Sequence, residues 1–374
     1  MFRNPMKKIL FSATALVAVV SLVLAGCGDD NDSEGADSSD KPLIVVTTNI
    51  LGDVVTNMVG DSFDVETIMP PGSDPHDFQA SAQQVQMMMS ADLLIVNGAN
   101  FEEGMLDVIE NAESDGVMIF EATSVISQLE GSDDHSDHGG HDDHDDHEGH
   151  DDHDEEKDHD DHEGHDDHDE EKDHDDHEGH GHDEEKDHDD HEGHDHGGID
   201  PHFFTDPARM AIVAQELSEV LAANFPDADQ GFVSTANDYV QQLQDLDSEV
   251  EETLSVIPND ERLLVTNHAV FAYFADRYSL TILGEIIPGS STLASASAQQ
   301  LASLSEEIKE SQVKANFTDA SSSDALAQTL SDEVNGVKVI NLYTESLGDP
   351  GSSGDSYIDM IRFNAEAIAS ALVE

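Results

Sequence analysis

The chain has 374 residues and a formal net charge of −70 at pH 7, because 84 acidic residues outnumber 14 lysines and arginines. Such a surface repels nucleic-acid phosphates and attracts cations, which excludes nucleic-acid binding. The single cysteine, Cys27, excludes an internal disulfide, so a hydrophobic core or a metal ion must hold the fold together.

The first 26 residues are typical of a lipoprotein signal peptide. The basic residues at its start are Arg3, Lys7 and Lys8. Residues 9–25 then carry no charge, and small residues precede Cys27. The alternative, a transmembrane anchor, would be short for about 30 Å of hydrocarbon. We therefore expect lipidation of Cys27, a polar tether over residues 27–41, and an extracytoplasmic protein anchored to a membrane, in the periplasm or on the outer face of the cell membrane.

Strands and helices alternate along the next part of the chain, which favours parallel βα units. The predicted strands are residues 42–48, 92–98 and 117–120, and the predicted helices are residues 49–59, 81–90 and 207–224. Asp206 suits the N-cap of the last helix, and Pro207 suits its first position. These elements predict an N-terminal α/β lobe over residues 42–227.

A low-complexity insertion interrupts this lobe. Residues 133–198 contain almost only His, Asp, Glu, Gly and a few lysines, and His144–Asp158 recurs letter for letter as His159–Asp173. Without apolar residues it cannot bury a core, so we expect a disordered tract. Imidazole and carboxylate groups at these spacings predict many weak metal sites. The alternative is a solvated linker that grew by repeat slippage.

A second α/β lobe follows a long amphipathic stretch. Ala228–Val256 is predicted to be one helix, stopped by Pro258, so residues 228–257 would link the lobes. Residues 258–374 form the predicted C-terminal lobe, with strands at residues 262–266, 281–284, 315–318 and 337–342 and helices at residues 298–311, 324–334 and 357–372. The lobes together have about 270 residues, which suits two lobes better than one core. Ligands of such sheets bind at the carboxyl ends of strands, which predicts a cleft between the lobes.

Three histidines lie outside the insertion, each in a loop beside a predicted strand or at the start of a helix. They are His76 in Asp74-Pro75-His76, His202 in Asp200-Pro201-His202, and His268 in Asn267-His268. A single histidine in a loop usually has no metal. Three of them at the ends of elements favour a metal site, because imidazole is a common ligand of zinc and related ions.

These segments resemble the metal-binding, substrate-binding proteins of ABC importers for zinc and manganese, over nearly all of the mature chain. The resemblance rests on Pro71–His76, Asp200–His202, Asn267-His268 with Tyr273-Phe274, Tyr343–Leu347, and Gly354–Tyr357 with Arg362–Asn364. The insertion lies where zinc-specific members carry a His-rich loop. Phe204 stands near the position at which the family commonly has tryptophan, and this chain has none.

The resemblance implies two α/β lobes joined by a rigid helix, with one metal ion between them. Its implied ligands are His76 and His202 from the first lobe and His268 and Glu345 from the second. Three imidazoles and one carboxylate suit tetrahedral Zn²⁺. Manganese-type members carry a carboxylate in place of the third histidine, because harder ions favour oxygen. Zinc is therefore the expected ligand and manganese the alternative, with either Glu345 or a water completing the site.

The function implied is that of a non-enzymatic carrier, expected to be monomeric, that delivers Zn²⁺ to an ABC permease in the membrane. Two other classes of protein are compatible with a lipid anchor and a metal-binding tract: an extracellular zinc buffer and an adhesin. A zinc hydrolase is disfavoured, because the chain has no His-Glu-x-x-His helix and four protein ligands leave no position for water.

Overall fold

The computed structural model describes residues 41–131, 198–321, 323–334 and 336–373. The predicted signal peptide, the lipidation site Cys27, the tether up to residue 40, and all of the His-rich insertion except Gly198 lie outside the described residues.

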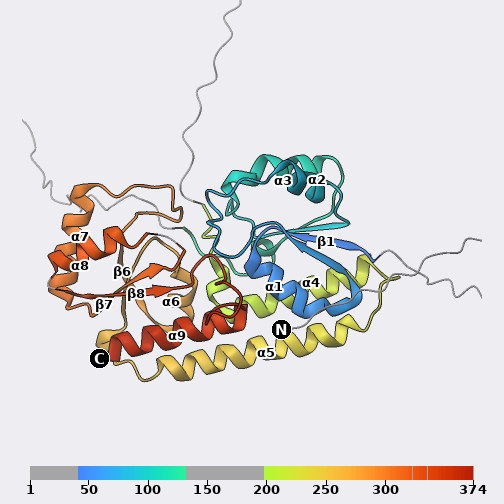
Figure 1. Cartoon of the computed structure of the whole chain (residues 1–374). Helices are drawn as coiled ribbons and strands as arrows, with labels where there is room; N and C mark the ends of the chain where they lie inside the picture. Colours follow the sequence, from blue (N-terminus) through green and yellow to red (C-terminus); the bar gives the residue numbers. More distant parts are fainter. Residues whose placement is uncertain (1–40, 132–197, 322, 335, 374) are drawn as a thin grey trace, which may run out of the picture. The chain divides into compact units, whose positions relative to one another are not determined.

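The N-terminal lobe is a parallel sheet with helices on both faces (Figure 1). Its strands are β1 (Leu43–Val46), β2 (Asp64–Thr67), β3 (Leu93–Val96) and β4 (Ile119–Glu121), in the order β2-β1-β3-β4. Its helices are α1 (Asn49–Val59), α2 (Ala82–Met89), α3 (Leu106–Ser114) and α4 (Pro207–Asn224). Side chains alternate along a strand, so Val45 packs with residues of α2 and α3, whereas Ile44 and Val46 pack with those of α1 and α4.

The C-terminal lobe repeats this arrangement. Its strands are β5 (Leu263–Thr266), β6 (Thr281–Glu285), β7 (Ala315–Asp319) and β8 (Lys338–Leu342), all parallel, in the order β6-β5-β7-β8. Its helices are α6 (Ala272–Tyr278), α7 (Ala298–Ser311), α8 (Ala325–Glu333) and α9 (Tyr357–Val373). Helices α7 and α8 pack on one face of the sheet, and α6 and α9 contribute to the core on the other.

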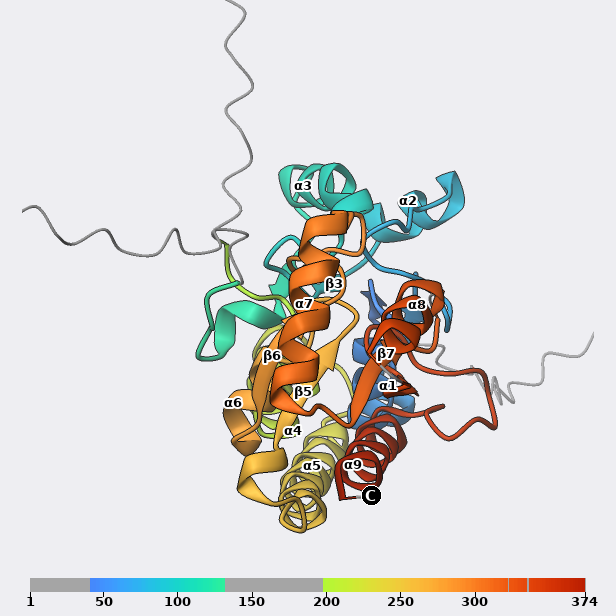
Figure 2. The same ribbon diagram turned by 90° about the vertical axis from the view of Figure 1, so that its left-hand side faces the viewer.

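Helix α5 (Phe232–Leu254) joins the lobes. Its buried residues recur every three or four positions and are Phe232, Ala236, Tyr239, Leu243, Leu246, Val250 and Leu254. This face packs on α1 and α4 of the first lobe and on α9 of the second, and Figure 2 shows α5 beside α9. One hydrophobic cluster therefore continues from the first sheet through α5 to the second, which makes the connection stiff.

The predicted α/β fold of two lobes joined by a long helix is confirmed, but some elements differ from prediction. The helix predicted from Ala228 begins at Phe232, because Gly231 N donates a hydrogen bond to Asp229 Oδ1 in a preceding turn (3.0 Å). Strand β2 and helices α3 and α6 were not predicted. Strand β2 is a mostly exposed edge strand, so it lacks the apolar pattern of a buried one.

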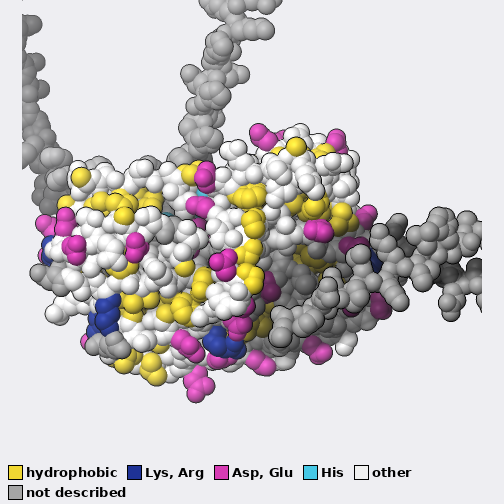
Figure 3. Space-filling model, viewed as in Figure 1, with side chains coloured by type: hydrophobic (Ala, Val, Ile, Leu, Met, Phe, Trp, Pro, Cys, Tyr) yellow, Lys and Arg dark blue, Asp and Glu magenta, His cyan; other side chains and the backbone are white. Residues whose placement is uncertain are grey.

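Short 3-10 helices complete the described structure at Gly60–Ser62, Glu103–Met105, Ala122–Val125, Phe203–Thr205 and Asn259–Glu261. Within the described ranges, no helix is both long and apolar enough to cross a membrane. Figure 3 shows acidic side chains scattered over one face of the molecule, with few lysines and arginines among them.

Candidate metal centre

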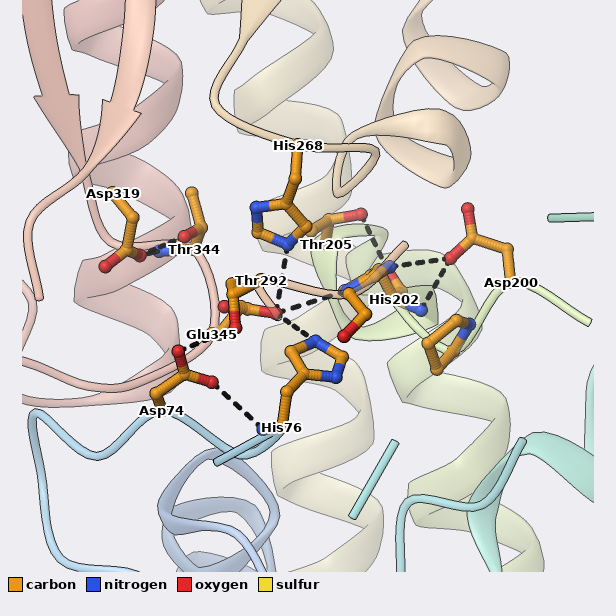
Figure 4. Close-up of polar contacts among 12 residues, drawn as sticks. Asp74, His76, Asp200, His202, Thr205, His268, Thr292, Asp319, Thr344 and Glu345 are labelled. Atoms are coloured by element: carbon orange, nitrogen blue, oxygen red, sulfur yellow. Dashed lines mark hydrogen bonds and ion pairs between the residues drawn. The ribbon is translucent and has the colours of Figure 1, made fainter. Parts of the chain in front are cut away.

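The structure brings together the four residues that the sequence predicted as ligands (Figure 4). The Nε2 atoms of His76, His202 and His268 lie 2.8, 3.3 and 3.0 Å from the same oxygen, Oε1 of Glu345. One possible ligand atom from each residue lies within 4.8 Å of all the others. None of the four side chains is more than 3% exposed, so Glu345 is not an ordinary surface carboxylate.

The three distances from the imidazole nitrogens to Glu345 Oε1 are close to the ligand–ligand distances of a tetrahedral zinc site. Zinc bonds of about 2.0–2.1 Å to nitrogen and oxygen place ligand atoms roughly 3.3 Å apart in a tetrahedron. In the present arrangement the ionised Glu345 can only accept hydrogen bonds, so each facing Nε2 carries a proton. A metal ion at this point would replace these protons, because imidazole binds a metal through an unprotonated nitrogen.

The electrostatics of the centre favour a charged metal-free state. Burial lowers the pKa of His76, but hydrogen bonds to Glu103 and Glu345 outweigh burial and raise the pKa to about 10. Burial likewise lowers the pKa of His202, and the charge of Asp200 reverses this, so that the net shift is upward. Burial raises the pKa of Glu345, but the surrounding imidazoles, His268 first, hold it well below its usual range.

The two histidines of the N-terminal lobe sit in matching Asp-Pro-His turns. Asp74 Oδ1 accepts a hydrogen bond from His76 N (2.9 Å), and Asp200 Oδ1 accepts one from His202 N (2.8 Å). The outer nitrogens also have acidic partners: His76 Nδ1 lies 2.9 Å from Glu103 Oε1, and His202 Nδ1 lies 2.8 Å from Asp200 Oδ1. Carboxylates that bind the far nitrogen orient an imidazole and make it a stronger ligand.

Aromatic packing fixes the same two rings. The ring of Phe101 meets His76 and His202 edge-on, with centroids 5.2 and 5.5 Å apart. Phe204 is buried and packs 5.3 Å from Phe101 and 5.9 Å from His202. Phenylalanine therefore fills this part of the centre.

The C-terminal lobe positions its two residues mainly through the backbone. His268 follows strand β5, and its carbonyl accepts a hydrogen bond from Thr266 Oγ1 (2.8 Å). His268 Nδ1 is buried and has no hydrogen-bond partner among the described residues. Glu345 follows strand β8, and its neighbour Thr344 is held by Asp319, to which both its backbone N–H and its hydroxyl donate.

Hydrogen bonds between the lobes surround the centre. Asn49, at the start of α1, donates through Nδ2 to Ser346 Oγ (2.9 Å) and accepts at Oδ1 from Leu347 N (2.8 Å). Thr292 Oγ1 donates to Asp74 Oδ2 (2.7 Å), as Figure 4 shows. Because of these contacts the four side chains lie in a buried space between the lobes rather than in an open cleft.

Comparison with known proteins identifies the kind of protein to which this centre belongs. Residues 44–371 match the family described as zinc-uptake complex component A, periplasmic. The chain belongs to this family. The match spans both lobes and all four converging residues, so the family assignment covers the whole centre.

Similar proteins have names that refer to metal binding or metal transport. Manganese ABC transporter substrate-binding lipoprotein PsaA of Streptococcus anginosus is 25% identical over 377 residues, which cover 98% of this chain and 99% of that protein. Manganese-binding lipoprotein MntA of Halalkalibacterium halodurans is 24% identical over 368 residues, which cover 98% of this chain and 99% of that protein.

The periplasmic zinc-binding protein TroA from Treponema pallidum has the same fold. Its structure superposes with a TM-score of 0.67 at 23% identity, covering 89% of this chain and 100% of that one. The family consists of metal-binding, substrate-binding components of ABC importers, so the predicted non-enzymatic role is confirmed. The predicted extracytoplasmic location agrees with the periplasmic description of the family.

The sequence did not assign a role to Glu103, Asp200 or Asn49. A signal for Asp200 was present, because Asp-Pro-His occurs twice and an aspartate two residues before a histidine can accept its backbone N–H. Glu103 and Asn49 each follow the carboxyl end of a predicted strand, the edge at which such sheets bind ligands. Their partners, however, come from distant parts of the chain and could not be inferred from spacing.

Proposed function

We propose that this protein binds one Zn²⁺ ion between its lobes, with His76, His202, His268 and Glu345 as ligands, and presents the ion to the permease of an ABC importer. The observation that carries this proposal is the convergence of three imidazole Nε2 atoms on one buried carboxylate oxygen, at 2.8–3.3 Å. Three nitrogen donors and one oxygen donor form a set that suits zinc.

Manganese is the alternative cargo, and several similar proteins carry manganese in their names. The third histidine favours zinc here, because manganese prefers oxygen ligands and this chain presents the imidazole of His268. The experiment is to delete residues 133–198, so that their weak sites do not add to the count, and to offer equimolar Zn²⁺ and Mn²⁺. We expect one zinc per chain by metal analysis. Retention of manganese in its place would contradict the zinc assignment.

The two lobes, residues 42–227 and 258–374, would act as one stiff body around the metal. The connector predicted at residues 228–257 contains α5, whose buried face shares its hydrophobic cluster with both lobes. A wide hinge motion would have to break this cluster. Release of the ion is therefore proposed to proceed by movement of loops around the centre, such as those that carry Thr292 and Ser346.

Membrane anchoring through Cys27 is part of the proposal, since similar proteins are named lipoproteins. Lipid chains on this residue would keep the carrier next to its permease. Replacing Cys27 with alanine is expected to move the protein from the membrane fraction to the soluble fraction. A variant that remains in the membrane fraction would contradict the assignment.

The His-rich insertion is proposed to raise the local zinc concentration near the centre. Its ends meet beside His202: Gly131 N donates to Gly198 O (2.7 Å), and Asp200 N donates to Leu129 O (2.9 Å). The described residues that flank the insertion therefore lie near the metal centre, and weak binding of zinc by the insertion would add to the effective concentration there. Unchanged zinc affinity of the centre and unchanged zinc-limited growth after deletion of these residues would contradict this role.

An extracellular zinc buffer or an adhesin would need no permease. Purification of the membrane-anchored protein, followed by identification of the proteins that purify with it, distinguishes these roles from that of a carrier. We expect an ABC permease in the complex.

A further inference from the structure

Glu103 lies on the outer side of the metal centre, where the predicted ligands do not reach. It begins the 3-10 helix Glu103–Met105, a few residues beyond the carboxyl end of strand β3. Its Oε1 atom lies 2.9 Å from His76 Nδ1, and its side chain is 33% exposed. Ser291, from the other lobe, also hydrogen-bonds Glu103. The carboxylate therefore touches a predicted ligand without being part of the buried core.

The three imidazoles differ in how their outer nitrogens are held. His202 Nδ1 has Asp200, whose side chain is 2% exposed and which also accepts the backbone N–H of His202. His76 Nδ1 has Glu103, while its backbone N–H is bound separately by Asp74. An imidazole held only at its inner nitrogen can turn about its bond to Cβ, whereas a second hydrogen bond fixes the ring and its tautomer.

In the described part of the chain, Glu103 is the neighbour of His76 that fixes the orientation of its ring. Phe101 meets one edge of the ring, but an aromatic edge cannot choose which ring nitrogen points inward. The Asp74 carboxylate binds the backbone N–H and Thr292, so it does not hold the ring. The hydrogen bond from Nδ1–H to Glu103 is thus the contact that aims Nε2 at Glu345 and at the ion between them.

We propose that Glu103 is a positioning residue of the metal centre, which fixes the ring of His76 through Nδ1 and thereby strengthens zinc binding. The inference rests on the proposed zinc-binding function. Glu103 does not itself bind the ion, because its carboxylate lies on the far side of the imidazole ring from Glu345.

The test measures zinc affinity of the mature full-length chain by competition with a fluorescent chelator, at less than one zinc per chain so that the tightest site fills first. Glu103→Ala is expected to weaken binding about tenfold or more, the usual effect of removing a carboxylate behind a metal-binding histidine. Glu103→Gln is expected to recover more than half of this loss on a logarithmic scale, because its amide oxygen still accepts Nδ1–H. The matched control is Glu113→Ala, which removes an exposed carboxylate at the end of α3.

Two results would overturn the proposal: a Glu103→Ala affinity within twofold of the Glu113→Ala control, or a Glu103→Gln variant as weak as Glu103→Ala. If Glu103→Ala also lowers the melting temperature of the metal-free protein, its loss of affinity could come from unfolding. In that case the zinc affinity of Glu103→Gln, compared with that of the control at equal concentration of folded protein, tests the proposal. His268→Ala is measured in parallel. Tight binding that survives His268→Ala would refute the proposed function, whereas loss there with no effect at Glu103 would refute only this inference.

Discussion

The two lobes each supply two of the four converging side chains, but they hold them in different ways. In the N-terminal lobe, carboxylates of Glu103 and Asp200 bind the outer nitrogens of His76 and His202. In the C-terminal lobe, the outer nitrogen of His268 has no partner among the described residues, and Glu345 is placed by the backbone of its segment. The difference shows that the first lobe presents a preorganised half-site, onto which the second lobe brings a less constrained pair.

The largest expected effect comes from removing an imidazole of the organised half. A zinc site with four ligands typically binds its ion with a free energy of about 10–16 kcal/mol, or roughly 3 kcal/mol for each ligand. Loss of one ligand should therefore reduce the affinity on the order of a hundredfold. We expect His202→Ala to lose at least this much in a chelator competition assay. Replacing one histidine of the insertion, His162→Ala, is the matched control and should leave the tightest site unchanged. Equal affinity of the two variants would rule out His202 as a ligand.

Low pH should weaken zinc binding, because protons compete with zinc for the histidines of the N-terminal lobe. The pKa of His76 is about 10, so in the metal-free protein this ring is protonated over the neutral range, and zinc must displace the proton. Affinity should therefore fall as the pH falls from 9 to 6, by about tenfold per unit for each displaced proton.

Calorimetry of zinc binding in buffers of different ionisation enthalpy would count the protons released. An affinity that does not change between pH 6 and 9 would show that the rings bind zinc without losing protons, contrary to this account.

The next largest effect on zinc affinity is expected from removing Asp200, the buried carboxylate that holds His202. Asp200→Ala leaves both the backbone N–H and Nδ1 of His202 without their acceptor, so we expect zinc affinity to fall about 10- to 100-fold. Asp227→Ala, which removes an exposed carboxylate of the same lobe, serves as the control. If Asp200→Ala lowers zinc affinity no more than the control does, the hydrogen bonds from Asp200 do not make His202 a stronger ligand than His268.

The smallest effect is expected where the lobes meet. Asn49→Ala removes the hydrogen bonds to Ser346 and Leu347, which should lower the free energy of unfolding by about 1–3 kcal/mol and weaken zinc binding only a few-fold. Asn57→Ala is the control for urea unfolding, because Asn57 lies in the same helix and its side chain donates within that helix, to Asp53. A loss of affinity as large as that of Asp200→Ala would show that the second lobe is positioned as tightly as the first.

Much of the fold follows from local pattern. The apolar runs of β1, β3 and β5 and the N-cap of α4 are visible in the sequence, because buried strands and capped helices depend on neighbouring residues. Strand β2 was not predicted, because an edge strand that is mostly exposed does not need a run of apolar residues. Helix α6 is short and begins at Ala272, only a few residues after His268, so the sequence did not separate the loop from the helix.

The sequence by itself showed three histidines outside the insertion, each beside a predicted strand or helix, and its resemblance to metal-binding, substrate-binding proteins implied that Glu345 joins them. Only the tertiary structure decided that the histidines' inner nitrogens meet at one oxygen of Glu345, that Glu103 lies behind His76, and that the outer nitrogen of His268 has no such partner among the described residues. These contacts join residues that are distant in the chain. Their distances depend on how two sheets pack around α5, which no local pattern encodes.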